Sequence, residues 1–210
     1  KPRTEWQSKC LDWKNKWPVY QGDYDVDNIN MYEFTNTLSK LLGENSIVVS
    51  DAGSAFFITS QSLKITHTSQ RYITSGAQAD MGFSLPAAIG ACLASKSPVI
   101  GITGDGSFQM NIQELTNVVN LQLPLKIFVL DNQRLGIVSQ FQLMNWDTDL
   151  STGNKNNPNF ANIARAYEIE SYEIDDKSQI DETLKNVFSN NKPCLVHCRI
   201  NYDEDVLPML

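Results

Sequence analysis

The chain has 210 residues, of which 41% are hydrophobic and 20% are charged, a composition typical of a folded globular protein rather than a disordered segment. It carries 17 lysines and arginines against 24 aspartates and glutamates, which gives a net charge of −7. Because nucleic acids and anionic membranes bind to basic surfaces, this charge argues against both as partners.

Residues 1–30 form a segment of their own. Apolar side chains recur there at helical spacing up to Pro18, which indicates a helix with one apolar face. We expect this helix to dock on a neighbouring domain, with a cofactor-binding box as the alternative. The polar stretch 21–30 reads as a linker to a domain over residues 31–210. The apolar face consists of Trp6, Cys10, Trp13 and Trp17.

The rest of the chain alternates between short apolar runs, typical of buried strands, and longer segments with helical periodicity. Apolar strands separated by helices indicate a parallel sheet that is covered on both faces. The expected fold class is therefore α/β, in three layers, with a mostly parallel central sheet of about six strands and helices on both faces. The expected strands are 46–51, 71–74, 97–103, 125–131, 168–174 and 193–200, and the expected helices are 31–43, 84–95, 109–122, 160–167 and 177–190.

The stretch 145–159 is the longest polar run and shows no periodicity. A solvated loop is the default interpretation, and a lid over an active site is the alternative. The residue pattern does not distinguish the two.

The cysteines include no CxxC motif and are expected to be reduced and buried. The two nearest in sequence fall in one expected strand, where four residues span about 13 Å, too far for a disulfide. With only two histidines, the local spacings assemble no zinc site. No signal peptide opens the chain and no apolar run approaches the roughly 18 residues of a membrane span, so we expect a cytoplasmic protein without membrane contact. The residues concerned are Cys10, Cys92, Cys194, Cys198, His67 and His197.

Two polar motifs follow neighbouring apolar runs. The run 104–107, Gly-Asp-Gly-Ser, comes after one expected strand, and Asp131 and Asn132 come after the next. Ligands of an open parallel sheet bind beyond the carboxyl ends of its strands, so Asp105 and Asn132 would share a crevice. Carboxylate and amide oxygens suit Mg²⁺, and the glycine and the helix start beside them favour close approach of an anion. The pair indicates a metal–diphosphate clamp, and two common turn motifs are the alternative.

Several segments resemble one known family. The GDGS motif, followed by an asparagine at the next strand end, is similar to the thiamine-diphosphate signature. Residues 71–91, RYITSGAQADMGFSLPAAIGA, resemble the preceding segment of acetolactate synthase large subunits and related 2-keto-acid enzymes, as do MNIQEL, DNQRLGIVSQ and the ending VLPML. The resemblance runs from about residue 31 to the C-terminus. It is to the C-terminal, diphosphate-binding domain of such an enzyme.

The resemblance implies roles for individual residues. Asp105 and Asn132 would bind Mg²⁺ through side-chain oxygens, and Arg134 through its backbone carbonyl. Met81 would wedge between the two rings of thiamine diphosphate, with a core methionine as the alternative, and Gly53 alternatively marks only a helix start. The residues that would contact the cofactor are Gly53, Ser54, Ala55, Ala79, Met81, Gly104, Gly106, Ser107, Gly136 and Ile137.

The resemblance also implies partners outside this chain, which begins with Lys1 rather than methionine and reads as a piece of a larger protein. In the family, a glutamate of an N-terminal pyrimidine-binding domain activates the cofactor, and FAD, where a full-length parent keeps it, binds a middle domain. No glutamate here matches that motif, so no catalytic residue is nominated. Because the family's site forms between two subunits, we expect a homodimer or homotetramer of the full-length parent, and an inactive fragment.

Four departures from the family pattern concern specificity more than the metal. Residues 54–56, Ser-Ala-Phe, replace a Gln-His-Gln-like run, and residues 77–80 replace a Gly-rich turn. Phe141 stands where tryptophan is common, and Asp131 takes the first place of an Asn-Asn pair. These changes leave the expected metal ligands in place, but they do not determine which acceptor substrate the enzyme would use.

The leading interpretation is the thiamine-diphosphate and Mg²⁺-binding domain of an acetolactate-synthase-like enzyme. Such an enzyme decarboxylates pyruvate or a related 2-keto acid and passes the two-carbon unit to an acceptor carbonyl, in branched-chain amino acid synthesis or a specialised role. A lyase, decarboxylase or transferase with another acceptor, such as a keto-sugar, is the alternative within the class. A non-catalytic phosphate-binding module and a structural remnant that only dimerises are alternatives from other classes.

Overall fold

The central sheet of the protein has six strands, all parallel, in the order β2-β1-β3-β4-β6-β5. The structure is a computed structural model and describes residues 3–20, 22, 28–95, 97–153 and 155–207. The predicted α/β fold with about six parallel strands is confirmed. The strands are β1 (Ile47–Ser50), β2 (Arg71–Ile73), β3 (Val99–Gly104), β4 (Leu125–Asp131), β5 (Glu170–Ile174) and β6 (Cys194–Arg199).

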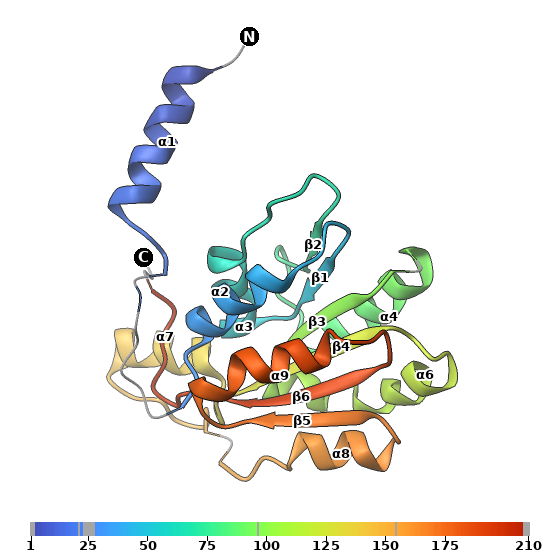
Figure 1. The fold of residues 1–210 in the computed structure, drawn as a ribbon. Helices are drawn as coiled ribbons and strands as arrows, with labels where there is room; N and C mark the ends of the chain where they lie inside the picture. The colour runs from blue at the N-terminus through green and yellow to red at the C-terminus, as the bar shows by residue number, and fades with distance from the viewer. Residues whose placement is uncertain (1–2, 21, 23–27, 96, 154, 208–210) are drawn as a thin grey trace.

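Helices cover both faces of the sheet, as predicted, and make a three-layer domain (Figure 1). Within the described residues no helix is long and apolar enough to cross a membrane. One face carries α2 (Met31–Leu41), α3 (Gly53–Ser62) and α9 (Ile180–Val187), and the other carries α4 (Ser84–Ser95), α6 (Leu115–Asn120) and α8 (Phe160–Ala166). The shorter or remaining elements are α5 (Asp105–Gln109), η1 (Ile112–Glu114), α7 (Gly136–Trp146) and η2 (Lys177–Gln179).

The continuous apolar runs of the strands follow from this layering. Every residue of β4 is buried, and successive side chains point to opposite faces. Phe128 and Leu130 enter the core under α2 and α9, whereas Ile127 and Val129 enter the core under α4 and α8. A strand with two covered faces is mostly apolar, which explains the apolar run of β4. Its buried Lys126 is accommodated because Nζ donates a hydrogen bond to Lys192 O at 2.6 Å.

Two helices lie where the periodicity predicts none, and one predicted helix is broken. The additional helices are α3 and α7, and the latter leaves Phe141 and Trp146 exposed, so that no apolar stripe faces the core. The segment predicted as one helix over 109–122 contains only the last residue of α5 and is then divided into η1 and α6. The chain leaves helical geometry at Asn111 (φ −134°, ψ 27°), whose side chain instead donates a hydrogen bond to Gly82 O at 2.7 Å.

The predicted N-terminal helix is present as α1 (Thr4–Lys16), and it projects away from the rest of the molecule (Figure 1). None of its residues is buried, so the prediction that all cysteines are buried is wrong for Cys10, although the other three are. Trp17 lies just past the helix end. Docking of this face on a neighbouring domain stays a prediction, and residues 21 and 23–27 of the predicted linker lie outside the described residues.

Candidate functional site

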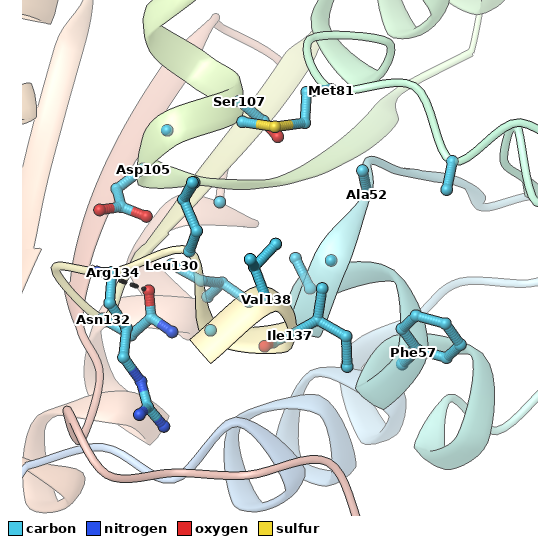
Figure 2. A pocket seen from close by; sticks show the side chains of 18 of the residues that line it. Ala52, Phe57, Met81, Asp105, Ser107, Leu130, Asn132, Arg134, Ile137 and Val138 are labelled. Carbon is cyan, nitrogen blue, oxygen red and sulfur yellow. Dashed lines mark hydrogen bonds between the residues drawn. The ribbon is translucent and has the colours of Figure 1, made fainter. Parts of the chain in front are cut away.

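The carboxyl ends of β1, β3 and β4 meet around one cavity of about 210 Å³ (Figure 2). The helix that follows β1, α3, lies on one face of the sheet, whereas the helices that follow β3 lie on the other face. The segments that leave these two strands therefore diverge, and a crevice remains between them. All the residues assigned by resemblance to the cofactor or the metal line this cavity, and their roles stay predictions. They are Gly53, Ser54, Ala55, Ala79, Met81, Gly104, Asp105, Gly106, Ser107, Asn132, Arg134, Gly136 and Ile137.

Three helices begin at the cavity without a side-chain cap. The first residues of α3, α5 and α7 all line it, and none of their N-cap residues donates or accepts a side-chain bond in the first turn. By contrast, Asn30 and Asn159 cap α2 and α8 with their side chains. The first N–H groups of a helix lack partners within the helix, and they carry partial positive charge. Three such ends around one cavity would favour an anion there.

The walls of the cavity fit a phosphate-containing ligand on two further grounds. A Cβ atom added to Gly104 would meet nothing within 4 Å, so the space beside this backbone is open. Ser54 Oγ is buried and has no hydrogen-bond partner among the described residues. Burial of a lone hydroxyl costs about 1–3 kcal/mol, which a ligand oxygen would offset. Both features lie where a diphosphate would contact the predicted residues.

Gly136 is needed for close packing at the floor of the site. A Cβ atom there would come within 2.6 Å of Ser54 Oγ and 2.7 Å of Asn132 Nδ2. The absent side chain therefore lets the start of α7 approach both α3 and the strand end that carries Asn132. The space beside Gly106 is less tight, because a Cβ atom there would lie 3.2 Å from Leu135 Cδ2 and 3.3 Å from Met81 Cε.

Met81 lies in the wall of the cavity rather than in the core. Its side chain is 40% exposed, which excludes the alternative of a core methionine, and it covers Gly106. Ala79, two residues earlier, has a left-handed backbone (φ 54°), a conformation that costs a residue with a Cβ atom about 1–2 kcal/mol. The Gly-rich turn expected from the family would adopt this backbone without that cost.

Asp51 fixes this loop, and the sequence motifs did not single it out. Its Oδ1 atom accepts hydrogen bonds from Gly82 N at 2.9 Å and from Ala52 N at 3.1 Å, and its Oδ2 atom accepts from Ser84 N at 2.9 Å and from Thr103 Oγ1 at 3.2 Å. The side chain is 1% exposed. One buried carboxylate thus ties the ends of β1 and β3 to the loop that carries Met81. The available signal was its place directly after a strand, like that of Asp105.

At the other end of the cavity, called the metal end below because the predicted metal ligands lie there, Asp105 and Asn132 are buried side chains of adjacent strand ends (Figure 2). Burial raises the pKa of Asp105 to about 7; the Asn157 hydrogen bond opposes this shift, and the nearby Asp131 charge adds to it. The described residues hold no cluster of three or more acidic, histidine or cysteine side chains that could bind a metal. A cation here would depend on one carboxylate with amide and backbone oxygens, a set that suits Mg²⁺.

The Arg134 side chain turns away from the metal end. Its guanidinium group donates to Asp205 Oδ1 at 3.1 Å, to Glu204 O at 3.2 Å and to Ser139 Oγ at 3.2 Å. The C-terminal segment is thereby held against α7, where Val206 also exchanges two hydrogen bonds with Gln140. This leaves only the backbone of Arg134 for the predicted metal contact, and residues 208–210 of the VLPML ending lie outside the described residues.

Asp131 belongs to a second buried group behind the cavity. His197 Nε2 lies 2.8 Å from Asp131 Oδ2, and Asn157 Nδ2 donates to Asp131 Oδ1 at 2.8 Å. Burial would raise the pKa of Asp131, but the hydrogen bonds with His197 and Asn157 outweigh it and hold that pKa below its ordinary value. Asp131 stays ionised here, and neither His197 nor Asn157 was identified from the motifs.

The polar stretch 145–159 is more than a solvated loop. Its first two residues complete α7, and the backbone of Thr152 then accepts a hydrogen bond from Leu135 N at 2.8 Å. Gly153 forms a bridge with Arg134, and Asn157 reaches the carboxylates of both strand ends. The segment therefore runs along the metal end of the cavity, while most of its side chains stay exposed.

Comparison with known proteins agrees with this geometry. Residues 51–198 match the family model of the thiamine pyrophosphate enzyme, C-terminal TPP binding domain. The chain is 36% identical over 209 residues to the acetolactate synthase isozyme 2 large subunit of Escherichia coli (strain K12), covering 98% of this chain and 38% of that protein. It is 31% identical over 211 residues to the isozyme 1 large subunit of the same organism, covering 100% and 37%.

A third relative is the mitochondrial acetolactate synthase catalytic subunit of Saccharomyces cerevisiae (strain ATCC 204508 / S288c), 32% identical over 217 residues, with 100% of this chain and 31% of that protein covered. The chain thus spans less than two fifths of the length of these relatives. The family match covers the strand ends, the three uncapped helix starts and Asp105, which are the parts that build the cavity. The chain belongs to the thiamine pyrophosphate enzyme family, as a member that carries its C-terminal TPP-binding domain.

Proposed function

We propose that this chain binds thiamine diphosphate together with Mg²⁺ and serves as the diphosphate-binding domain of an acetolactate-synthase-like enzyme. The observation that carries the proposal is the convergence of three uncapped helix starts on one cavity with the buried Asp105 at its edge. The backbone groups suit the diphosphate, and the carboxylate suits the cation that diphosphates bring with them. Relatives described as acetolactate synthase large or catalytic subunits support the enzyme class.

The chain's own residues would bind and orient the cofactor. Gly104, Gly106 and Ser107 would hold the diphosphate from one side, and the starts of α3 and α7 from the other. Met81 would limit the shape of the cofactor above Gly106. When bound, thiamine diphosphate supplies a nucleophilic carbon and an electron sink for cleavage beside the keto group of a 2-keto acid. Asp105, Asn132 and the Arg134 carbonyl would hold Mg²⁺.

The remainder of the site would come from other parts of a full-length homodimer or homotetramer. Phe57 and Val138 line the cavity and are 37% and 42% exposed, and Phe141, on the same helix as Val138, is 52% exposed. Exposed apolar side chains of this kind suit a covering protein surface. That surface would supply the activating glutamate, so the fragment by itself would be inactive. We assign the full-length enzyme to the cytoplasm, with pyruvate as the 2-keto acid and acetolactate as the product. A different acceptor, such as a keto-sugar, is the alternative, because Phe141 departs from the family pattern.

The test is calorimetric titration of thiamine diphosphate into the chain, with Mg²⁺ and with chelator, on the wild type and Asp105→Asn. Binding that needs Mg²⁺ and is lost in Asp105→Asn supports the clamp. Binding that ignores both the metal and the substitution contradicts it and identifies a plain phosphate module, which backbone amides alone can form. If no binding occurs, the pyrimidine-binding domain of a related synthase is added in trans, and failure there also contradicts the proposal. Product analysis on the full-length enzyme then identifies the acceptor.

A further inference from the structure

The side-chain amide of Asn157 lies between two buried carboxylates. Its Nδ2 atom donates to Asp105 Oδ2 and, at 2.8 Å, to Asp131 Oδ1. Asp105 directly follows β3 and Asp131 ends β4, so the amide joins the carboxyl ends of two neighbouring strands. Both acids are at most 3% exposed. A single N–H₂ group therefore bridges the two acids and donates one hydrogen bond to each.

The orientation of this amide is fixed by a third contact. Gln109 Nε2 donates to Asn157 Oδ1 at 3.2 Å, so the oxygen faces a donor and the nitrogen faces the carboxylates. The opposite orientation would set an amide oxygen against two carboxylate oxygens. Two buried acids this close repel each other when both are ionised, and the two N–H donors reduce that repulsion.

Asn157 also connects the metal end to the segment 147–159. Within the part of the chain that the structure describes, this segment meets the site at two places, through Thr152 and Gly153 near the start of α7 and through Asn157 at the strand ends. Asn159 then caps α8 and ends the segment. Loss of the Asn157 contacts would release the segment between Gly153 and Asn159 from the acids, whereas its two ends would stay attached.

We propose that Asn157 is a positioning residue for the metal end of the site: it holds Asp105 in place for a divalent cation and couples the order of segment 147–159 to that end. The proposal rests on the proposed function where it concerns the metal, and on the hydrogen bonds alone where it concerns the segment. It gives the longest polar run of the chain a role that neither the motif nor the family model assigns. Asn157 touches the acids rather than the reacting atoms, so it acts through Asp105.

The first test needs no metal. Hydrogen exchange of the backbone amides of residues 151–153 and 155–157 is compared for the wild type, Asn157→Ala and Asn156→Ala, where Asn156 is the exposed neighbour. We expect exchange to rise about tenfold in Asn157→Ala, as for the loss of about 1.4 kcal/mol, and to stay at the wild-type rate in Asn156→Ala. Equal rates in all three proteins would overturn the coupling of the segment to the strand ends.

The second test measures the affinity for Mn²⁺, as a spectroscopic substitute for Mg²⁺, in the presence of inorganic pyrophosphate. We expect about tenfold weaker binding in Asn157→Ala, the usual effect of losing a group that orients a metal ligand, with Asn156→Ala unchanged. Asn157→Asp should loosen the segment without metal and regain protection with Mn²⁺, because a third carboxylate needs the cation. A purely structural role would give the same exchange in Asn157→Asp with and without Mn²⁺, and this result would overturn the positioning role.

The two tests separate this inference from the proposed function. If the wild type binds no Mn²⁺, the proposed function and the metal part of this inference both fail, and the exchange experiment still decides whether Asn157 anchors the segment. If the wild type binds Mn²⁺ and Asn157→Ala binds it equally well, the proposed function stands and the positioning role is wrong.

Discussion

Gly104→Ala should separate ligand binding from folding. The backbone of Gly104 (φ −80°, ψ 162°) is one that alanine adopts without strain. An added Cβ atom would meet nothing within 4 Å in the protein, because it would project into the cavity. The unfolded alanine chain has fewer conformations than the glycine chain, so we expect the free energy of unfolding to rise by about 0.4–1 kcal/mol.

The same methyl group should obstruct a diphosphate. It would stand beside the first N–H groups of α5, where a phosphate oxygen needs to come within about 3 Å. Loss of one charge-assisted hydrogen bond costs about 1.5–3 kcal/mol, which corresponds to roughly 10- to 100-fold weaker binding. The assay is calorimetric titration of inorganic pyrophosphate with Mg²⁺, a probe that does not need the pyrimidine half of the site, together with urea unfolding of each variant.

Gly90→Ala is the matched control. Gly90 is an exposed residue of α4 that does not line the cavity, and its added Cβ atom would also meet nothing within 4 Å. We expect a similar gain in stability of about 0.5–1 kcal/mol and unchanged pyrophosphate affinity. The reasoning is refuted if Gly104→Ala binds pyrophosphate within about twofold of the wild type, or if Gly104→Ala is destabilised while Gly90→Ala is not.

Three further predictions concern packing, protonation and the N-terminal helix. Gly136→Ala should lower the free energy of unfolding by about 1–3 kcal/mol in urea titrations, because its Cβ atom would lie 2.6 Å from Ser54 Oγ and 2.7 Å from Asn132 Nδ2; wild-type stability would contradict this packing. Because the pKa of Asp105 is raised to about 7 and a cation binds its ionised form, the dissociation constant of Mn²⁺ should rise about tenfold from pH 8 to pH 6; a flat profile would contradict the shift. Removal of residues 1–16 should leave the urea unfolding of the domain unchanged within about 0.5 kcal/mol, since α1 has no buried residue; a lower midpoint would show that α1 packs on the domain.

The sheet and the location of the site are predictable from the sequence for a common reason. A strand such as β4 is covered on both faces, so its apolar run marks it as a central parallel strand, and the first polar residues after it mark its carboxyl end. Parallel strands put such ends at one edge, which is why Asp105 and Asn132 were expected together and lie around one cavity. The parallel order of the strands was therefore sufficient to predict that Asp105 and Asn132 lie close together.

Contacts across long sequence separations were not predictable in this way. Asp51 holds Gly82, Ser84 and Thr103, and Asn157 holds Asp105 and Asp131, through hydrogen bonds that no local pattern encodes. Such pairings depend on loop conformations, which the short motifs do not specify. An aspartate after a strand and an asparagine in a polar run are each common as turn residues.

The helices at the cavity were missed because they do not follow the amphipathic rule. A helix on a solvent-exposed protein surface has an apolar stripe toward the core and polar residues elsewhere. The helix α7 instead exposes Val138, Phe141 and Trp146 while it buries Gly136, Ser139 and Gln140. Its outward face is therefore more apolar than its inward face. This inverted pattern is what a helix shows when its outer side belongs to an interface, and it agrees with a site that is completed by another protein surface.

Asp131 stands where the family pattern has an asparagine, and this difference changes the charge beside the site. Asp131 does not line the cavity, so it does not compete with Asn132 for the predicted metal position. Its charge still reaches Asp105 and contributes to the raised pKa of that carboxyl. His197 at Asp131 Oδ2 and Asn157 at Asp131 Oδ1 compensate for the buried charge. The metal end thus contains one more negative charge than the family pattern requires, and the two N–H donors of Asn157 reduce the repulsion between Asp105 and Asp131.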